Sequence, residues 1–293
     1  MLAQQLFNAL SLGGVYALFA LGFTLVFGVL GVINLSHGAV FMVGAYAALV
    51  AATKLHWPLG ADLAFAFVVA GALGLAVDVA VLRPLRARGA PHLVPMIATI
   101  GLAIAVNNFA QGLFGAANQR FPTELLPQQT LHFGGVDVTA IELGIIALSL
   151  LLMAALLFAL RSTQLGRALR AIAESPKAAA LLGINVEGLF MLTSFVAAGF
   201  GGVAGVLIGL YSNALFPLMG QPMLHKGIAV IILGGMGDIR GAMLAGMFLG
   251  FAEVLSVAYI GSTMRDAVAF GLLFGVLLLR PRGLFGRTNE RKV

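Results

Sequence analysis

The stretch STQLGRALRAIAESPKAAALLGIN, residues 162–185, separates two long apolar runs with a short charged segment. The runs on either side, near 140–160 and 188–211, are each long enough to cross the hydrocarbon core of a membrane, which takes about 20 helical residues. Within the stretch, Ser175 before Pro176 is a helix-start signal. The pattern predicts two membrane helices joined by a polar loop that holds a small helix of its own.

The composition of the whole chain indicates the same class of protein. Of its 293 residues, 60% are hydrophobic and 10% are charged, whereas about a quarter of the residues of a soluble domain are charged. Further apolar runs lie near 6–30, 38–53, 63–82, 93–114, 242–260 and 264–280. A shorter run at 227–236 is either a span or a re-entrant helix, because irregular backbone is tolerated at membrane depth where protein buries it. We therefore expect an all-α integral membrane protein, a polytopic helical bundle of about 8–9 transmembrane helices forming a single domain, residues 1–293.

The distribution of positive charge predicts how the helices are oriented. When the short run is counted as a span, the 17 Lys and Arg residues divide 13 to 4 between the two sides. The richer side holds Arg83, Arg86, Arg88, Arg161, Arg167, Arg170, Lys177, Arg240, Arg280, Arg282, Arg287, Arg291 and Lys292, and the poorer side holds Lys54, Arg120, Lys226 and Arg265. Because cytoplasmic loops are enriched in Lys and Arg, the N-terminus is expected outside the plasma (bacterial inner) membrane. The C-terminus and the loop 161–187 are expected in the cytoplasm.

The small helix in this cytoplasmic loop is too short to be stable alone. It would run for about two turns from the Ser175–Pro176 start to Leu182, with Gly183 suited to the position after the helix end. An isolated helix of this length is marginal in water, so it needs a partner surface. From the residues alone, a docking element, a helix lying on the membrane and an ordinary basic loop are all open.

The chain lacks the residues of several kinds of active site. It has no cysteine, which excludes disulfides and thiolate metal sites. The segment GQPMLHKG, residues 220–227, lacks the Gly before Lys and the following Ser or Thr that a phosphate-binding loop needs. No paired carboxylates or closely spaced His residues point to hydrolysis or a metal centre, and the His residues are expected at the membrane interfaces. Nucleic-acid binding is not expected despite the net charge of +6, because the positive residues lie in loops that set membrane orientation.

Small residues recur at four-residue spacing in two of the expected spans. One ladder is Gly201, Gly205 and Gly209, and the other is Ala242, Gly246 and Gly250. Such ladders place small residues on one face of a helix and predict close helix packing.

Polar side chains within the spans are the candidates for a substrate pathway, because polar groups are costly at membrane depth. Asn107 and Asn108 present neighbouring amides about 100° apart on one helix, and each either faces the pathway or bonds to another helix. Asn34, Ser36 and His37 lie where the chain breaks between the first two helices. We favour Asn34 and Ser36 as caps of the second helix, with a lining role as the alternative.

Two carboxylates also fall within expected spans. Glu253 lies mid-span, where an uncompensated charge would cost several kcal/mol, so it is expected to be neutral, paired or facing water. Thr24 and Ser256 are possible partners, and Glu253 joins the pathway candidates. Asp78 precedes Arg83 by five residues and is expected to pair, or to reach water, near the cytoplasmic face.

The segment LGRALRAIAESPKAAALLGINV resembles the cytoplasmic loop of the permeases of branched-chain amino acid (LIV) ABC importers. NLSHGAVFMVGAY (34–46), ATIGLAIAVNN (98–108), ILGGMGDIRGAMLAGMFLG (232–250) and LLLRPRGLFG (277–286) are similar to other segments of that family, so the resemblance covers nearly the whole chain. The length of the chain and its NLSHG segment look more like the shorter of the family's two permease types.

The resemblance implies a transport subunit that does no covalent chemistry. It implies that the cytoplasmic loop forms a coupling helix docked on an ATP-binding subunit, with Arg167 and Arg170 flanking the docking residues Glu174, Ser175, Pro176, Ala178, Ala179, Leu182 and Gly183. The implied partners are a second homologous permease, two ABC ATPases that bind ATP and Mg, and an external substrate-binding protein. No cofactor is expected on this chain itself. Amides, urea and aromatic acids remain alternatives to branched-chain amino acids.

A rival from another class is an ATP-independent secondary transporter or channel for small solutes. Intramembrane charges and broken helices are typical of such proteins. Glu253 and Asp78 are the residues that favour this alternative.

Overall fold

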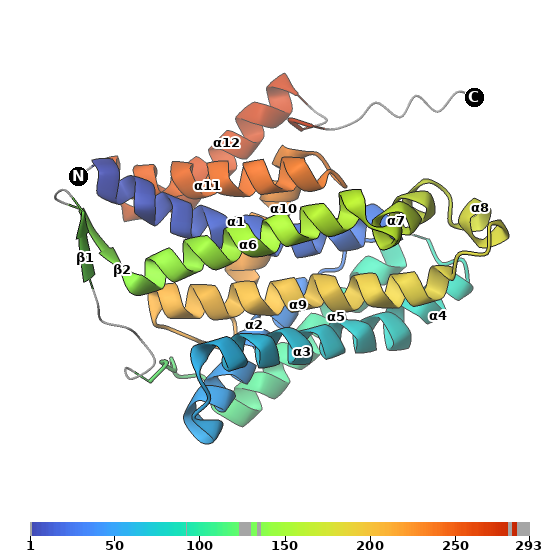
Figure 1. Cartoon of the computed structure of the whole chain (residues 1–293), viewed down its shortest axis with the longest axis horizontal. Coiled ribbons are helices and arrows are strands. Elements are labelled where there is room, and N and C mark those ends of the chain that lie inside the picture. The colour runs from blue at the N-terminus through green and yellow to red at the C-terminus, as the bar shows by residue number, and fades with distance from the viewer. Residues whose placement is uncertain (1, 92, 123–129, 134–135, 281–282, 286–293) are drawn as a thin grey trace.

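The computed structural model describes residues 2–91, 93–122, 130–133, 136–280 and 283–285. Long helices lie side by side in one bundle, as Figure 1 shows. In chain order the first half holds α1 (Leu2–Leu30), α2 (His37–Val50), the π-helical turn η1 (Ala51–Leu55), α3 (Leu59–Val77), the π-helical turn η2 (Asp78–Leu82), α4 (Arg83–Ala87) and α5 (Leu93–Phe114). The second half holds β1 (Thr130–Phe133), β2 (Val136–Thr139), α6 (Ala140–Ser162), α7 (Gln164–Glu174), α8 (Pro176–Leu181), α9 (Val186–Ser212), α10 (Gly220–Gly234), α11 (Ile239–Tyr259), the 3-10 turn η4 (Ser262–Met264) and α12 (Arg265–Leu279).

Eight helical segments of the described chain are long and apolar enough to cross a membrane. They match the eight long apolar runs of the sequence to within a few residues, and this confirms the predicted all-helical membrane fold. The shorter ninth run belongs to α10, which begins seven residues earlier than its apolar part, at Gly220, and is 15 residues long. It is too short to count among the eight, because about 20 residues are needed to span.

The two ends of the bundle differ in charge. The N-terminal end of α1 lies at one end beside the β1–β2 hairpin, while α4, α7 and α8 lie together at the opposite end (Figure 1). These three helices carry five of the basic residues assigned above to the richer side: Arg83, Arg86, Arg167, Arg170 and Lys177. The grouping agrees with the division of loops predicted from charge.

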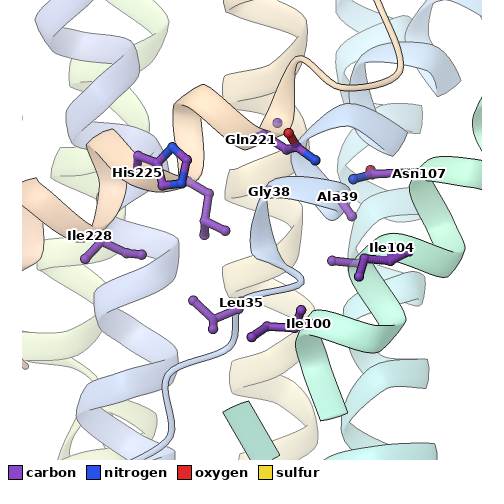
Figure 2. Close-up of a pocket in the computed structure, with 12 residues that line it drawn as sticks. Leu35, Gly38, Ala39, Ile100, Ile104, Asn107, Gln221, His225 and Ile228 are labelled. Atoms are coloured by element: carbon purple, nitrogen blue, oxygen red, sulfur yellow. The ribbon is translucent and has the colours of Figure 1, made fainter. Parts of the chain in front are cut away.

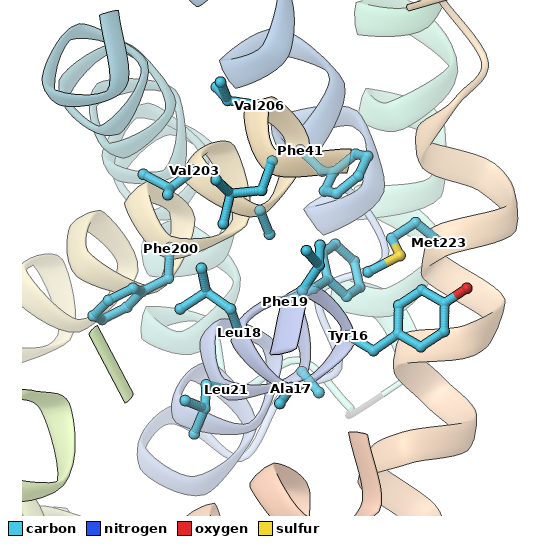
Figure 3. Packing of buried hydrophobic residues seen from close by; sticks show 14 of the residues in the cluster. Tyr16, Ala17, Leu18, Phe19, Leu21, Phe41, Phe200, Val203, Val206 and Met223 are labelled. Carbon is cyan, nitrogen blue, oxygen red and sulfur yellow. The ribbon is translucent and has the colours of Figure 1, made fainter. Parts of the chain in front are cut away.

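The core of the bundle is built around α1. Residues 11–26 of this helix are all buried. Figure 3 shows Phe19 and its neighbours on α1 meeting Phe41 of α2, Val203 of α9 and Met223 of α10. Phe19 and Phe41 pack edge to face with ring centroids 5.4 Å apart. The first helix is therefore surrounded by protein and has little contact with lipid.

The glycine ladders make close helix contacts, as predicted. A Cβ at Gly205 would overlap the carbonyl oxygen of Phe41, and a Cβ at Gly250 would overlap the backbone of Gly13. These overlaps mean that α9 approaches α2, and α11 approaches α1, by backbone contact rather than through side chains.

Three local features were not predicted from the sequence. The π-helical turn η1 ends the second membrane helix, and η2 lies within the third, between α3 and α4. A hairpin pairs β1 with β2 in antiparallel register, Thr130 opposite Thr139. Thr139 then begins α6 with a capping box, in which its hydroxyl accepts from the N–H of Glu142 and the Glu142 carboxylate accepts from the N–H of Thr139.

Candidate functional site: a membrane groove and an exposed helix pair

A groove of about 400 Å³, open on one side, lies between α2, α5 and α10. Figure 2 shows the side chains that point into it. It is lined by Leu35, Gly38, Ala39, Ile100, Ala103, Ile104, Asn107, Gly220, Gln221, Leu224, His225 and Ile228. Ile104 lies near the middle of the α5 span, so the groove lies at membrane depth.

The polar residues of the groove are two amides and an imidazole. Asn107 is 8% exposed, and its Oδ1 has no hydrogen-bond partner among the described residues. Gln221 and His225 are exposed on the open side of the groove. Because polar groups at this depth are costly against lipid, this face is suited to contact with water or with another protein.

Two helices begin at the groove. Gly38 and Ala39 belong to the first turn of α2, and Gly220 and Gln221 to the first turn of α10. Neither helix has a side-chain cap. The two first turns touch through backbone, since a Cβ at Gly220 would overlap the carbonyl of Gly38. The groove thus receives the positive ends of two helix dipoles.

Asn34, Ser36 and His37 lie beside the groove but do not line it. The Asn34 Oδ1 accepts from the Ser36 hydroxyl at 2.6 Å and from the Ser36 N–H at 3.1 Å, which closes a turn ahead of α2. The prediction that Asn34 and Ser36 cap the second helix is wrong, because this bond occupies both side chains before the helix starts. The His37 ring is buried against Phe19, at 4.7 Å between ring centroids, rather than at a membrane interface as predicted.

The remaining predicted pathway residues lie elsewhere. Asn108 is exposed outside the groove, and its Nδ2 donates to the carbonyl of Ile104 in its own helix at 2.8 Å. Glu253 is fully buried; it accepts a hydrogen bond from Lys226 Nζ at 2.6 Å and forms an ion pair with Arg265. Of the three options predicted for Glu253, the structure selects pairing, with two cations in place of Thr24 or Ser256.

The Glu253 cluster joins four helices, α1, α10, α11 and α12. Lys226 of α10 also donates to the hydroxyl of Tyr16 at 2.9 Å and lies 3.6 Å from Asp266 of α12. Lys226 and Arg265 line a second cavity of about 240 Å³. Lys226 had been placed in an outer loop, so the sequence did not indicate it as the partner of a buried carboxylate.

The helix pair α7–α8 protrudes at the end of the bundle (Figure 1). Ser175 caps α8 as predicted, accepting from the N–H of Ala178 at 3.3 Å, and Gly183 follows the helix with a φ of 81°. Leu181 and Leu182 are 90% and 80% exposed. The pair therefore presents two apolar side chains outside the bundle.

Most of the predicted docking residues share this surface. Arg167, Arg170, Glu174, Pro176, Ala178, Leu182 and Gly183 are exposed, and Ser175 is half-buried. Ala179 differs, since it is 1% exposed and packs with Ile172 of α7 and Phe190 of α9. Ala179 therefore holds α8 onto the bundle and is not available to a partner, whereas Leu181, missed in the sequence, is.

An ion-pair network lies at the base of this segment. The Asp78 carboxylate is fully buried and accepts from Arg86 Nη1 at 2.7 Å. Arg86 and Arg83 also pair with Glu187 in the first turn of α9, at 3.4 and 3.3 Å. The network ties the end of α3 to the start of α9, immediately after the exposed helix pair, and confirms that Asp78 is paired.

Some of the predicted basic residues lie outside the part of the chain that the structure describes. Arg282, Arg287, Arg291 and Lys292, assigned above to the more positive side, lie outside the described residues. Within the described chain, no group of three His, Asp or Glu residues has the geometry to hold a metal ion.

The chain matches the family model described as branched-chain amino acid transport system / permease component over residues 5–278. It is 39% identical to the high-affinity branched-chain amino acid transport system permease protein BraD of Pseudomonas aeruginosa and 36% identical to LivH of Escherichia coli K12, each over 99% of this chain and 97% of the relative. The permease LivM of Escherichia coli K12 is 27% identical over 94% of this chain and 69% of its own length. No solved structure matches the chain.

Proposed function

The chain belongs to the branched-chain amino acid transport permease family, and from this premise we propose that it imports branched-chain amino acids by alternating access, driven by partner ATPases. Its family, and its likeness to the shorter LivH and BraD type, confirm what the sequence motifs predicted. It is a non-catalytic permease component of a multi-subunit ABC transport system. The proposed partners are a second homologous permease, two ABC ATPases that bind Mg and ATP, and an external substrate-binding protein.

The observation that carries the proposal is the apolar tip of α8. Leu181 and Leu182 are almost fully exposed on a capped helix beyond the membrane spans. Neighbouring exposed leucines favour a protein partner, because burying a Leu side chain contributes about 1.5–3 kcal/mol. In the proposed mechanism this tip docks in a cleft of an ATPase, and closure of the two ATPases moves it.

The network behind α8 supports the transmission of this movement. Glu187 at the start of α9 pairs with Arg83 and Arg86, and Arg86 in turn pairs with the buried Asp78. A displacement of α8 therefore acts on α9 and on the α3–α4 segment together. The start of α9 also packs directly on α8 through Phe190 and Ala179.

The groove between α2, α5 and α10 supports the proposed pairing with a second permease. Gln221 and His225 are exposed at membrane depth, where lipid would leave their polar groups without partners. A second permease facing α5 and α10 would enclose a polar pathway between the two subunits. In this arrangement the N-terminus lies outside, and α7 and α8 lie in the cytoplasm, consistent with the positive residues at that end.

The test uses an affinity-tagged chain purified from its native membrane in mild detergent. Leu182→Asp is expected to reduce co-purification of the ATPase at least tenfold, because docking would bury an unpaired charge. Leu182→Met, which keeps the apolar contact, is the matched control and should co-purify as the unaltered chain does. Both variants should reach the membrane in equal amounts, since Leu182 is exposed. Unchanged co-purification of the Asp variant would contradict the docking role.

A further inference from the structure

We propose that the groove between α2, α5 and α10 binds the main-chain groups of a zwitterionic amino acid. The first turns of α2 and α10 would bind the carboxylate, and the Asn107 Oδ1 would accept a hydrogen bond from the ammonium group. This inference rests on the proposed transport function and adds to it the chemical groups that the pathway recognises.

The carboxylate position follows from the two uncapped helix starts. The N–H groups of Gly38 and Ala39 have no hydrogen-bond acceptor among the described residues, and both residues line the groove. The backbone contact between Gly38 and Gly220 brings the start of α10 to the same place. There the Gln221 N–H already donates to the carbonyl of Leu218 and Pro222 has no N–H, so α10 contributes the positive end of its dipole. A helix start carries roughly half a positive charge, so two such starts favour an anion without a cationic side chain. Helices that begin within the membrane bind substrate carboxylates in this way in other transporters.

The ammonium position follows from Asn107. Its side chain points into the groove (Figure 2), is 8% exposed, and leaves Oδ1 without a partner in the described chain. A buried acceptor left unsatisfied costs about 1–3 kcal/mol, so a donor is expected at this position. Gln221 offers a second amide across the groove from Asn107.

The rest of the groove lining indicates which side chain and which net charge the bound ligand has. Leu35, Ile100, Ile104, Leu224 and Ile228 supply an apolar surface suited to a branched aliphatic group. The lining contains no Lys, Arg, Asp or Glu, so a ligand with no net charge is favoured over an anion or a cation. The partial charges of helix starts also bind a carboxylate more weakly than a fully charged side chain would. Weaker binding suits a pathway that must release its substrate. The groove therefore favours a branched-chain amino acid over urea or an amide, neither of which has a carboxylate.

The test exploits the absence of cysteine from this chain. Ala103→Cys places one thiol in the groove, and its rate of labelling by a small maleimide is measured in the assembled transporter without binding protein. Millimolar L-leucine is expected to slow labelling at least fivefold. The analogues 3-methylbutylamine, which lacks the carboxylate, and 4-methylpentanoate, which lacks the ammonium group, are expected to slow it less than twofold. Equal protection by leucine and 4-methylpentanoate would overturn the role of the ammonium group.

Asn107→Leu, in the Ala103→Cys background, removes the acceptor with little change in size. It should raise the leucine concentration needed for half-protection at least tenfold. Gln111→Leu is the matched control: Gln111 is exposed on the same helix, one turn further along and outside the groove, so protection should be unchanged. Unchanged protection in Asn107→Leu would overturn the assignment, and so would loss of the second permease from that variant, because Asn107 would then be an interface contact.

Co-purification of the ATPase is measured in the same preparations, so that the two proposals can fail separately. An assembly that contains the ATPase but shows no protection by leucine would overturn the groove site and leave the importer standing. Protection by leucine in a preparation that never contains an ATPase would support the site and overturn the importer.

Discussion

Removal of Lys226 is expected to destabilise the protein more than any change of an exposed charge. Its ammonium group lies 2.6 Å from the Glu253 carboxylate, and the two side chains are 12% and 0% exposed. Breaking a buried ion pair by removing one partner costs about 3–5 kcal/mol, because the other charge is left buried without compensation. Arg265 still contacts Glu253 in Lys226→Met, so the lower value, about 3 kcal/mol, is expected. At roughly 2–4 °C per kcal/mol, this corresponds to a fall in Tm of about 6–12 °C.

The assay is thermal denaturation of the purified assembly in detergent, for Lys226→Met, Glu253→Gln and the double variant. The two changes remove the same interaction, so the double variant should lose about 2 kcal/mol less than the sum of the single losses. Leucine uptake per folded transporter should stay within a few-fold in Glu253→Gln, because the carboxylate is structural. Additive losses, or single losses below about 1 kcal/mol, would refute the buried pair. Abolished uptake with normal stability would instead favour the ion-coupled alternative.

Two further predictions concern packing and the ion-pair network. Gly205→Ala should cost several kcal/mol and sharply reduce the amount of folded protein, because its Cβ would overlap a carbonyl oxygen in α2. Gly101→Ala has open space at its Cβ and should be neutral or stabilising by up to about 1 kcal/mol. Thermal denaturation compares the two variants. Arg86→Ala should cost about 3 kcal/mol by leaving the buried Asp78 unpaired, whereas Arg83→Ala, at a side chain 49% exposed, should cost less than about 1 kcal/mol. Equal melting temperatures within either pair of variants would contradict the packing or the pairing respectively.

The membrane spans and the small helix α8 could be predicted from sequence because their signals are local. A run of about 20 apolar residues specifies a span wherever it occurs. The Ser175–Pro176 start and Gly183 are likewise read from adjacent positions, and the structure has both features. The glycine ladders also predicted backbone contact correctly, although the helix that each ladder meets is a matter of tertiary structure.

The groove could not be predicted because it joins residues far apart in sequence. Gly38, Asn107 and Gln221 come from three helices, and only Asn107 is an unusual residue for its span. Asn34 and Ser36 were misread as caps because they precede the helix at suitable positions, yet they bond to each other first. Sequence spacing does not show which of two competing local hydrogen bonds a short polar side chain makes.

Lys226 was missed for a related reason. The short apolar run after it made it look like a residue of an outer loop, but α10 begins at Gly220 and carries Lys226 against α1 and α11. The signal that was available is the mid-span Glu253, for which pairing was one of the three options predicted. Ala179 shows the opposite limit, since a motif residue expected to contact a partner instead packs within its own chain.

The central claim, ATP-driven import, is tested most directly by uptake of labelled L-leucine into proteoliposomes that hold the purified assembly. ATP is enclosed inside, substrate-binding protein is supplied outside, and proton and sodium gradients are collapsed with ionophores. The account predicts uptake that requires both ATP and the binding protein, persists without ion gradients and is lost in Leu182→Asp. Uptake that proceeds without ATP and stops when an ion gradient is collapsed would contradict it and identify the chain as a secondary transporter.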